Sequence, residues 1–383
     1  MRFSRNIILF FTSFLISIFL AEILVRLSIG GPKEISERVR VVDKNFGYKV
    51  NSTIDGVDTY GFRNLDSANL AYDIATIGDS HTWGYNVEME DTWPFLLQKS
   101  TNLSVYNMGV GGNGIYSYHY LIKNELQKGK KVILGLYLPN DFERGGYGCF
   151  INFNNSFWFQ EVNRLNLNPP ECIKSQKKNT ILSKFKFLIK SLQLKSSILT
   201  LAKHEIYVRL QSYLLKSRSE YLFINEQFQP ISFGMLEAQS KQMDISNIFM
   251  RLGLEDFKKM LIDWTENTDR KQLGIIVIPS RQLVYRSIIV MKGDENKFIN
   301  LDILNNYTEN EIKLEQVIIK ELNDLKIPSR SVRSELTQTF INNFPRNGVE
   351  NFYPDKAHPG IIGHKAYALS ATKVLNEMEN FNK

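Results

Sequence analysis

The chain has 383 residues, of which 43% are hydrophobic and 23% are charged, as is typical of folded proteins. This composition excludes a disordered chain, and the length allows one large α/β domain with additions or two smaller domains. The net charge of +7 is concentrated in residues 174–218, where eleven Lys or Arg and one acidic residue give a local charge of +10. The rest of the chain therefore carries −3, the difference between the two values.

The N-terminal segment predicts a membrane anchor. Arg2 and Arg5 form a basic flank before an apolar run that continues to Ile29 and is long enough to span a bilayer. A cleavable signal peptide is the alternative, although only a weak match to a cleavage site follows the run. We expect a single-pass anchor over residues 1–31, a stalk and lead-in over 32–71, and export of the rest to the periplasm or cell exterior.

A serine follows the first predicted strand of the main domain. The apolar run Tyr72–Ile77 is typical of a buried parallel strand that stops at Gly78. Ser80 then stands just beyond the carboxyl end of this strand, where open α/β sheets bind their ligands. Because Gly-Asp-Ser is also an ordinary turn sequence, this stretch alone does not identify a site.

A second polar stretch lies near the C-terminus. Asp355 and His358 are three residues apart, a spacing at which a carboxylate can orient an imidazole that faces a serine. Pro359 suits the start of the helix predicted over 361–379. Asp355 as a simple helix cap is the plainer alternative. Together with Ser80, the pair supplies the side chains of a catalytic triad.

Two further stretches follow predicted strands and carry hydrogen-bond donors. The strand at 104–107 leads into a glycine-rich block that contains Gly112, and the strand at 131–138 leads to Asn140. The backbone N–H groups of Ser80 and Gly112 and the side-chain amide of Asn140 would form a three-donor oxyanion hole. Taken separately, a glycine turn and an asparagine turn are the alternatives.

Four short blocks resemble the signature of the SGNH (GDSL-type) hydrolases, in the order of that family: Gly78-Asp79-Ser80-x-Thr82, the block around Gly112, Asn140-Asp141, and Asp355-x-x-His358-Pro359. The resemblance covers roughly residues 72–145 and 270–375. It implies that Ser80 is the nucleophile, His358 the base and Asp355 its orienter. It also implies that Ser80, Gly112 and Asn140 donate to the oxyanion. Leu138 stands where the family usually has a glycine, which bears on the shape of the substrate.

Other polar residues of these blocks have less specific roles. His81 and Asp141 adjoin the predicted nucleophile and oxyanion hole, and we expect them to line the substrate site. The histidines His119, His204 and His364 have no set of partners at ligand spacing. We therefore expect neither a metal site nor a cofactor.

The order of predicted elements indicates the fold. Strands at 72–77, 104–107 and 131–138 alternate with helices at 91–98 and 115–127. The alternation resumes in a late block of elements: helix 246–267, strand 274–279, helix 311–325, strand 327–332 and helix 361–379. This pattern predicts an α/β fold with three α/β/α layers and a mainly parallel five-stranded sheet over residues 72–383. The resemblance implies the SGNH or flavodoxin-like arrangement.

Residues 142–245 interrupt this alternation and predict a helical, basic insertion. Apolar residues between Leu182 and Tyr213 recur at helical spacing with lysines between them. Such a helix either packs over the domain, docks on a membrane surface, or lines an anionic glycan groove. Nucleic acid is not expected as a partner of an exported protein. Cys149 and Cys172, the only cysteines, either form a disulfide or stay unpaired.

These observations favour a membrane-anchored serine esterase that removes O-acetyl groups from cell-envelope carbohydrate, a substrate class implied by the resemblance alone. An O-acyltransferase that uses the same triad with a sugar hydroxyl as acceptor is the first alternative. A glycan-binding scaffold without catalysis is the second. The expected partners are an acylated glycan or small molecule and the membrane, and the sequence does not indicate an oligomeric state.

Overall fold

The computed structural model describes residues 2–28, 40–43, 47–64, 71–142, 220–224, 227–231, 243–266, 272–292, 301–347, 352–353 and 357–380. Its contacts divide the chain into one unit of Met1–Val42 and Pro169–Ser217 and a second unit of Asp43–Asn168 and Arg218–Lys383. Several predictions fall outside the described residues: the basic helix at 174–218, His204, the pairing of Cys149 and Cys172, and the position of Asp355.

Helix α1, Arg2–Ser28, forms over the segment predicted as an anchor. Among the helices in the described part of the chain, none is both long and apolar enough to cross a membrane. The structure therefore confirms a helix here but does not support the predicted membrane span. The short strands β1 (Arg40–Asp43) and β2 (Gly47–Val50) come next in the chain.

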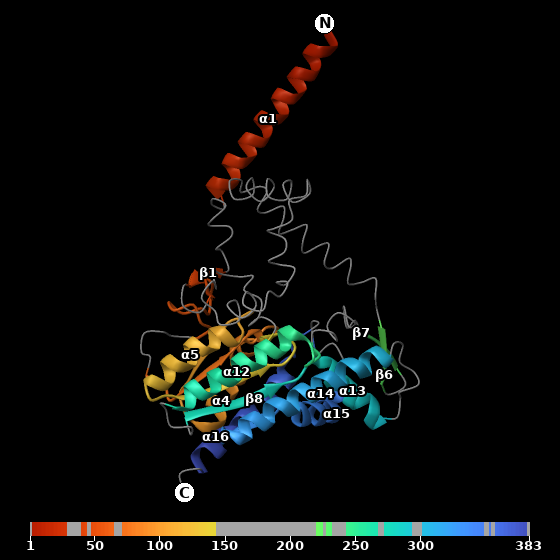
Figure 1. The fold of residues 1–383 in the computed structure, drawn as a ribbon. Helices are drawn as coiled ribbons and strands as arrows, with labels where there is room; N and C mark the ends of the chain where they lie inside the picture. Colours follow the sequence, from red (N-terminus) through yellow and green to blue (C-terminus); the bar gives the residue numbers. More distant parts are fainter. Residues whose placement is uncertain are drawn as a thin grey trace. The chain divides into compact units, whose positions relative to one another are not determined.

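A five-stranded parallel sheet forms the centre of the second unit and confirms the predicted sheet (Figure 1). In spatial order its strands are β4 (Val105–Gly109), β3 (Ile74–Gly78), β5 (Lys131–Tyr137), β8 (Leu273–Ile278) and β9 (Ser329–Ser331), and every neighbouring pair is parallel. This is the order of flavodoxin-like doubly wound sheets, in which ligands bind outside the carboxyl ends of the strands at the switch point. Here the switch point lies between β3 and β5.

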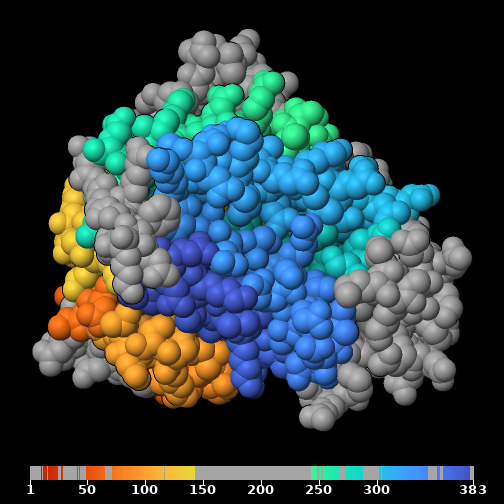
Figure 2. All heavy atoms as spheres, turned by 90° about the horizontal axis from the view of Figure 1, so that it is seen from below, coloured from red at the N-terminus to blue at the C-terminus, as the bar shows by residue number. Residues whose placement is uncertain are grey.

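Helices cover both faces of the sheet, as its fully buried strands require. On one face α4 (Trp93–Thr101) contacts α16 (Ile361–Asn380), and on the other α5 (Ile115–Gln127) contacts α12 (Ile248–Glu266). The remaining long helices are α13 (Arg281–Lys292), α14 (Leu301–Asp324) and α15 (Arg333–Asn347). Figure 2 shows α16 in dark blue, between α4 in orange and the lighter blue of residues 301–347.

The predicted helical insertion is corrected where the structure describes it. Strands β6 (Glu220–Ile224) and β7 (Gln227–Ile231) form an antiparallel hairpin in which Phe223 pairs with Phe228. Aromatic and β-branched side chains favour strands, and two residues between them are the commonest hairpin spacing. Helices α13 and α15 and the first half of α14 are also absent from the prediction.

Candidate active site

Ser80 begins the short helix α3 (Ser80–Trp83) directly after β3. Asp79 caps this helix, because its Oδ1 accepts a 2.8 Å hydrogen bond from the backbone N–H of His81. The Ser80 hydroxyl lies 3.3 Å from Asp79 Oδ2. Asp79 is fully buried, whereas Ser80 keeps 7% of its surface exposed. The cap fixes the start of α3 and therefore the position of the serine.

Three glycines in register on neighbouring strands form a floor beneath α3. Gly78 on β3 is in register with Gly109 on β4 and with Gly135 on β5. A Cβ atom at Gly135 would lie 2.7 Å from Thr82 Oγ1, and one at Gly109 would lie 2.3 Å from the backbone N of Trp83. The helix that carries the serine thus rests directly on the sheet, at a separation that side chains on the floor would prevent.

His358 meets Ser80 across 278 positions of sequence. The distance from His358 Nε2 to Ser80 Oγ is 2.7 Å, which is a hydrogen bond. His358 lies three positions before the start of α16, and its contact with Ser80 places it where β3 ends. The imidazole packs against the ring of Tyr85, with centroids 5.1 Å apart and planes 24° apart, and against the ring of His81, also 5.1 Å away.

The predicted oxyanion donors lie in the loops after the strands on either side of β3. Gly112 has a φ of +89°, and a Cβ atom at neighbouring Gly111 would lie 3.4 Å from Ser80 Cβ. Asn140 follows β5, and its buried Oδ1 has no hydrogen-bond partner among the described residues. The structure therefore brings the glycine block beside Ser80, while the donor roles stay predictions. The orienting role of Asp355 also stays a prediction.

The two residues predicted to line the substrate site are both buried. His81 is 1% exposed, its ring packs 3.9 Å from that of Tyr137, and its Nδ1 lies 3.1 Å from the Tyr367 hydroxyl. Asp141 is fully buried and accepts hydrogen bonds from the Tyr118 hydroxyl at 2.9 Å and from the Tyr137 backbone N–H at 2.7 Å. Both side chains turn inward and brace the loops of the site. Their contact with substrate stays a prediction.

The other described histidines are structural. His364 is fully buried on α16 and accepts a 3.2 Å hydrogen bond at Nδ1 from the backbone N–H of Trp93. Burial, followed by the charges of His358 and Arg63, lowers the pKa of His364 to about 3, so this imidazole is neutral at physiological pH. Among the residues that the structure describes, no three His, Cys, Asp or Glu side chains gather as metal ligands would.

The sequence analysis missed Asn107, which helps to hold α3. Its Nδ2 donates a 3.0 Å hydrogen bond to the carbonyl oxygen of Thr82, and its Oδ1 accepts one of 2.9 Å from the Gly109 N–H. The signal was an asparagine inside a predicted buried strand, because a buried amide needs hydrogen-bond partners. Tyr85, which packs on His358, has no comparable signal in the sequence.

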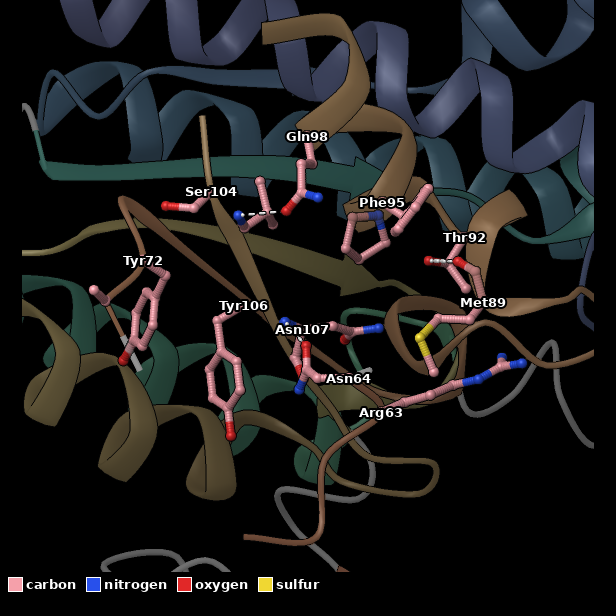
Figure 3. A pocket seen from close by; sticks show the side chains of 13 residues that line it. Arg63, Asn64, Tyr72, Met89, Thr92, Phe95, Gln98, Ser104, Tyr106 and Asn107 are labelled. Carbon is pink, nitrogen blue, oxygen red and sulfur yellow. Dashed lines mark hydrogen bonds between the residues drawn. The ribbon is translucent and has the colours of Figure 1, made fainter. Parts of the chain in front are cut away.

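A cavity of about 230 Å³ lies beside β4, and neither Ser80 nor His358 lines it (Figure 3). Asn64 closes the strand edge there: its Nδ2 donates to the Asn107 carbonyl at 3.1 Å and its Oδ1 accepts from the Asn107 N–H at 2.9 Å. The cavity is therefore part of the covered edge of β4. We do not assign it to the active site.

Comparisons with known proteins leave the family open. No family model matches the chain, and no curated protein matches it. Among solved structures, it is similar to LAE5, described as an alpha/beta hydrolase enzyme from the metagenome of Lake Arreo, Spain, with 12% identity and a TM-score of 0.30 over 80% of this chain and 97% of that one. The resemblance to the SGNH hydrolases thus stands on the motifs themselves.

Proposed function

We propose that this protein is a serine hydrolase of carboxylic esters, with Ser80 as nucleophile and His358 as general base. The observation that carries the proposal is the 2.7 Å hydrogen bond between His358 Nε2 and Ser80 Oγ. An imidazole within hydrogen-bond reach of a serine hydroxyl is the arrangement that activates serine for attack on a carbonyl. The serine also stands at the switch point of a parallel sheet, where such sheets bind ligands.

The proposed reaction has two steps. Ser80 Oγ bonds to the ester carbonyl carbon while its proton passes to His358 Nε2, and the carbonyl electron pair moves onto the oxygen. When this intermediate collapses, the bond to the leaving alcohol breaks and the alcohol takes the proton from His358. Water then attacks the acyl-serine with His358 as base, the acid departs, and Ser80 regains its proton.

The oxyanion and the imidazolium need stabilisation during both steps. In this proposal the backbone N–H groups of Ser80 and Gly112 and the Asn140 amide hold the oxyanion, each contributing about 2.7 to 4 kcal/mol. Asp355 would hold the second ring nitrogen of His358 and stabilise its charged form. No metal or cofactor takes part in this scheme.

An active-site serine probe tests the assignment directly. A fluorophosphonate should label the wild-type protein, and Ser80→Ala should abolish the labelling because the nucleophile is gone. Ser100→Ala is the matched control, since Ser100 lies exposed on α4 and its hydroxyl hydrogen-bonds to Leu97 and Thr372. Equal labelling of wild type and Ser80→Ala would refute the nucleophile. A wild type that resists labelling would favour the glycan-binding scaffold.

For the substrate we propose an O-acetylated carbohydrate, supported by the motif resemblance. If a sugar hydroxyl replaces water in the second step, the same residues perform O-acyl transfer. An acetylated oligosaccharide incubated with a labelled unacetylated one separates the two. Acetate release indicates hydrolysis, and mass spectrometry that finds acetyl groups on the labelled acceptor indicates transfer.

A further inference from the structure

The segment Asp58–Asn64 has no part in the reaction proposed above, yet it contacts the helix that carries Ser80. Arg63 donates three hydrogen bonds to backbone carbonyls: from Nη1 to Trp83 at 3.3 Å and to Gly84 at 2.6 Å, and from Nη2 to Val87 at 2.9 Å. These carbonyls lie at the end of α3 and in the loop that follows. One guanidinium thus binds both ends of the loop 84–87.

The loop 84–87 connects the nucleophile to the base. At its start, the N–H groups of Gly84 and Tyr85 donate to the Ser80 carbonyl oxygen at 3.1 and 3.2 Å. On its other side, the Tyr85 ring packs on the His358 imidazole, and Asn86 Nδ2 lies 3.5 Å from the His358 carbonyl oxygen. The position of this loop therefore sets how His358 approaches Ser80.

Hydrogen bonds of neighbouring residues hold the segment that carries Arg63. Asp58, 5% exposed, accepts hydrogen bonds at Oδ1 from the N–H groups of Tyr60 and Phe62, at 2.9 and 3.0 Å, and at Oδ2 from the Tyr106 hydroxyl at 2.6 Å. Figure 3 shows Asn64 against Asn107 on β4, with the Arg63 side chain extending to the opposite side. The segment is thus attached to the sheet and reaches the loop through Arg63.

We propose that Arg63 is a positioning residue for the reaction, which fixes the loop 84–87 and through it the alignment of His358 on Ser80. This inference rests on the proposed function. A lysine cannot replace the guanidinium here, because its single ammonium cannot serve three carbonyls at these separate positions. Burial lowers the pKa of Arg63, and the nearby Glu88 and Glu90 oppose that shift, so the group stays cationic at neutral pH.

The test compares Arg63→Ala, Arg63→Lys and Arg330→Ala with the wild type. Arg330 lies on β9 in a surface ion pair with Glu377, so Arg330→Ala controls for the loss of an arginine. The readouts are the rate of fluorophosphonate labelling, the kcat and KM for p-nitrophenyl acetate, and the thermal midpoint. Arg63→Ala should lower kcat and the labelling rate about 10- to 100-fold with KM within about 2-fold, because a small misalignment of base and nucleophile has that effect. Arg63→Lys should lower kcat and the labelling rate by a smaller factor than Arg63→Ala, and Arg330→Ala should match the wild type.

Chemical rescue separates positioning from general destabilisation. Guanidinium at millimolar concentration should raise the kcat of Arg63→Ala at least about 3-fold while leaving that of Arg63→Lys and Arg330→Ala unchanged, since only Ala leaves room for the missing group. If Arg63→Ala does not fold, Arg63→Lys decides: its labelling rate must fall below that of the wild type while it remains folded.

The proposal is overturned if folded Arg63→Lys and Arg63→Ala label at the wild-type rate, or if their loss of activity follows only the fraction unfolded. Failure of the proposed function is distinguishable from this, because it would appear in the wild type as labelling that does not depend on Ser80. In a double mutant with Tyr85→Leu, the loss should be smaller than the product of the two single losses, because both residues act on His358 through one loop.

Discussion

Two buried polar clusters in the second unit look alike in chemistry and differ in access. In the first, Ser80 is 7% exposed and its hydroxyl meets a half-buried imidazole on His358. In the second, Glu311 of α14 accepts hydrogen bonds from the N–H and the hydroxyl of Ser280, both at 2.5 Å, and both residues are fully buried. The first cluster thus keeps some exposure to solvent, and the second has none.

A shifted pKa does not distinguish them. Burial raises the pKa of Glu311 to about 7, which in an exposed cleft would suggest a catalytic acid. One turn further along α14, Glu315 accepts from the Ser331 hydroxyl and lies 3.3 Å from Arg333 Nη1. The cluster therefore ties α14 to the starts of α13 and α15 and serves as a brace. In this protein, the remaining exposure of Ser80 and His358 separates the candidate site from the brace.

The prediction with the largest expected effect concerns the cluster of Ser80 and His358. Replacing His358 by Ala removes the proposed base, so kcat/KM for p-nitrophenyl acetate should fall at least about 1000-fold, with the thermal midpoint nearly unchanged. His119→Ala is a matched control, because His119 lies half-buried on α5 beside Asp263, apart from the site. Activity of His358→Ala within about tenfold of the wild type would remove the base from the proposal.

The sequence predicts the strands around Ser80 well because a buried parallel strand is a local pattern. Strands β3, β4 and β5 lie within two residues of their predicted bounds, and α5 matches its predicted range of 115–127. Helix α13 is missed, although Ser280 supplies the signal of a helix start. Its Oγ accepts a hydrogen bond of 3.1 Å from the Leu283 N–H, as an N-cap serine does.

The sequence also predicts part of the candidate site, because its motifs are local patterns too. The motifs identify Ser80 and His358, and the structure places them in contact. The motifs do not predict burial, however, and His81 and Asp141, which are expected to line the substrate site, are 1% and 0% exposed. The glycine floor and the packing of Tyr85 on His358 depend on strand register and on a loop fold, which a single sequence does not reveal.

The next prediction concerns the fully buried cluster of Glu311 and Ser280, and its effect on stability depends on pH. Because the folded-state pKa of Glu311 is raised from 4.5 to about 7, the native protein holds a proton that the unfolded chain releases. Stability is therefore lost as pH rises from about 4.5 to about 7, by a total of about 3 kcal/mol. Glu311→Gln keeps the shape of the protonated side chain, with one oxygen that accepts and an NH2 group that donates, but it cannot ionise, so it should lack this loss.

Urea unfolding of both proteins between pH 4 and pH 8 measures the effect. The free energy of unfolding of Glu311→Gln relative to the wild type should rise by about 3 kcal/mol over that range. Contributions of other groups, such as His364, cancel in this difference. The control is Glu377→Gln, which removes an exposed carboxylate paired with Arg330 and should leave the pH profile unchanged. A pH-independent difference for Glu311→Gln would mean that folding does not raise the pKa of Glu311, which would contradict the prediction.

The smallest effect tests the glycine floor of the accessible cluster. In Gly135→Ala the new methyl would lie 2.7 Å from Thr82 Oγ1, while its next contacts, with Trp93 and Ile278, are at 3.4 and 3.5 Å. Overpacking of this kind costs about 1 to 3 kcal/mol of unfolding free energy. Because the close contact is with one side-chain oxygen, Thr82→Ala should relieve it.

A double-mutant cycle with Thr82→Ala, followed by urea unfolding, isolates that contact. Gly135→Ala should cost less than about 1 kcal/mol in the Thr82→Ala background, so the two changes should be non-additive by about 1 to 2 kcal/mol. The fluorophosphonate labelling rate should fall in Gly135→Ala and recover in the double mutant, because the strain acts on the helix that carries Ser80. Additive costs would show that α3 does not rest on Gly135. The same cycle between Gly135 and Glu311 should give no coupling, since the floor and the brace share no contact among the described hydrogen bonds and close glycine contacts.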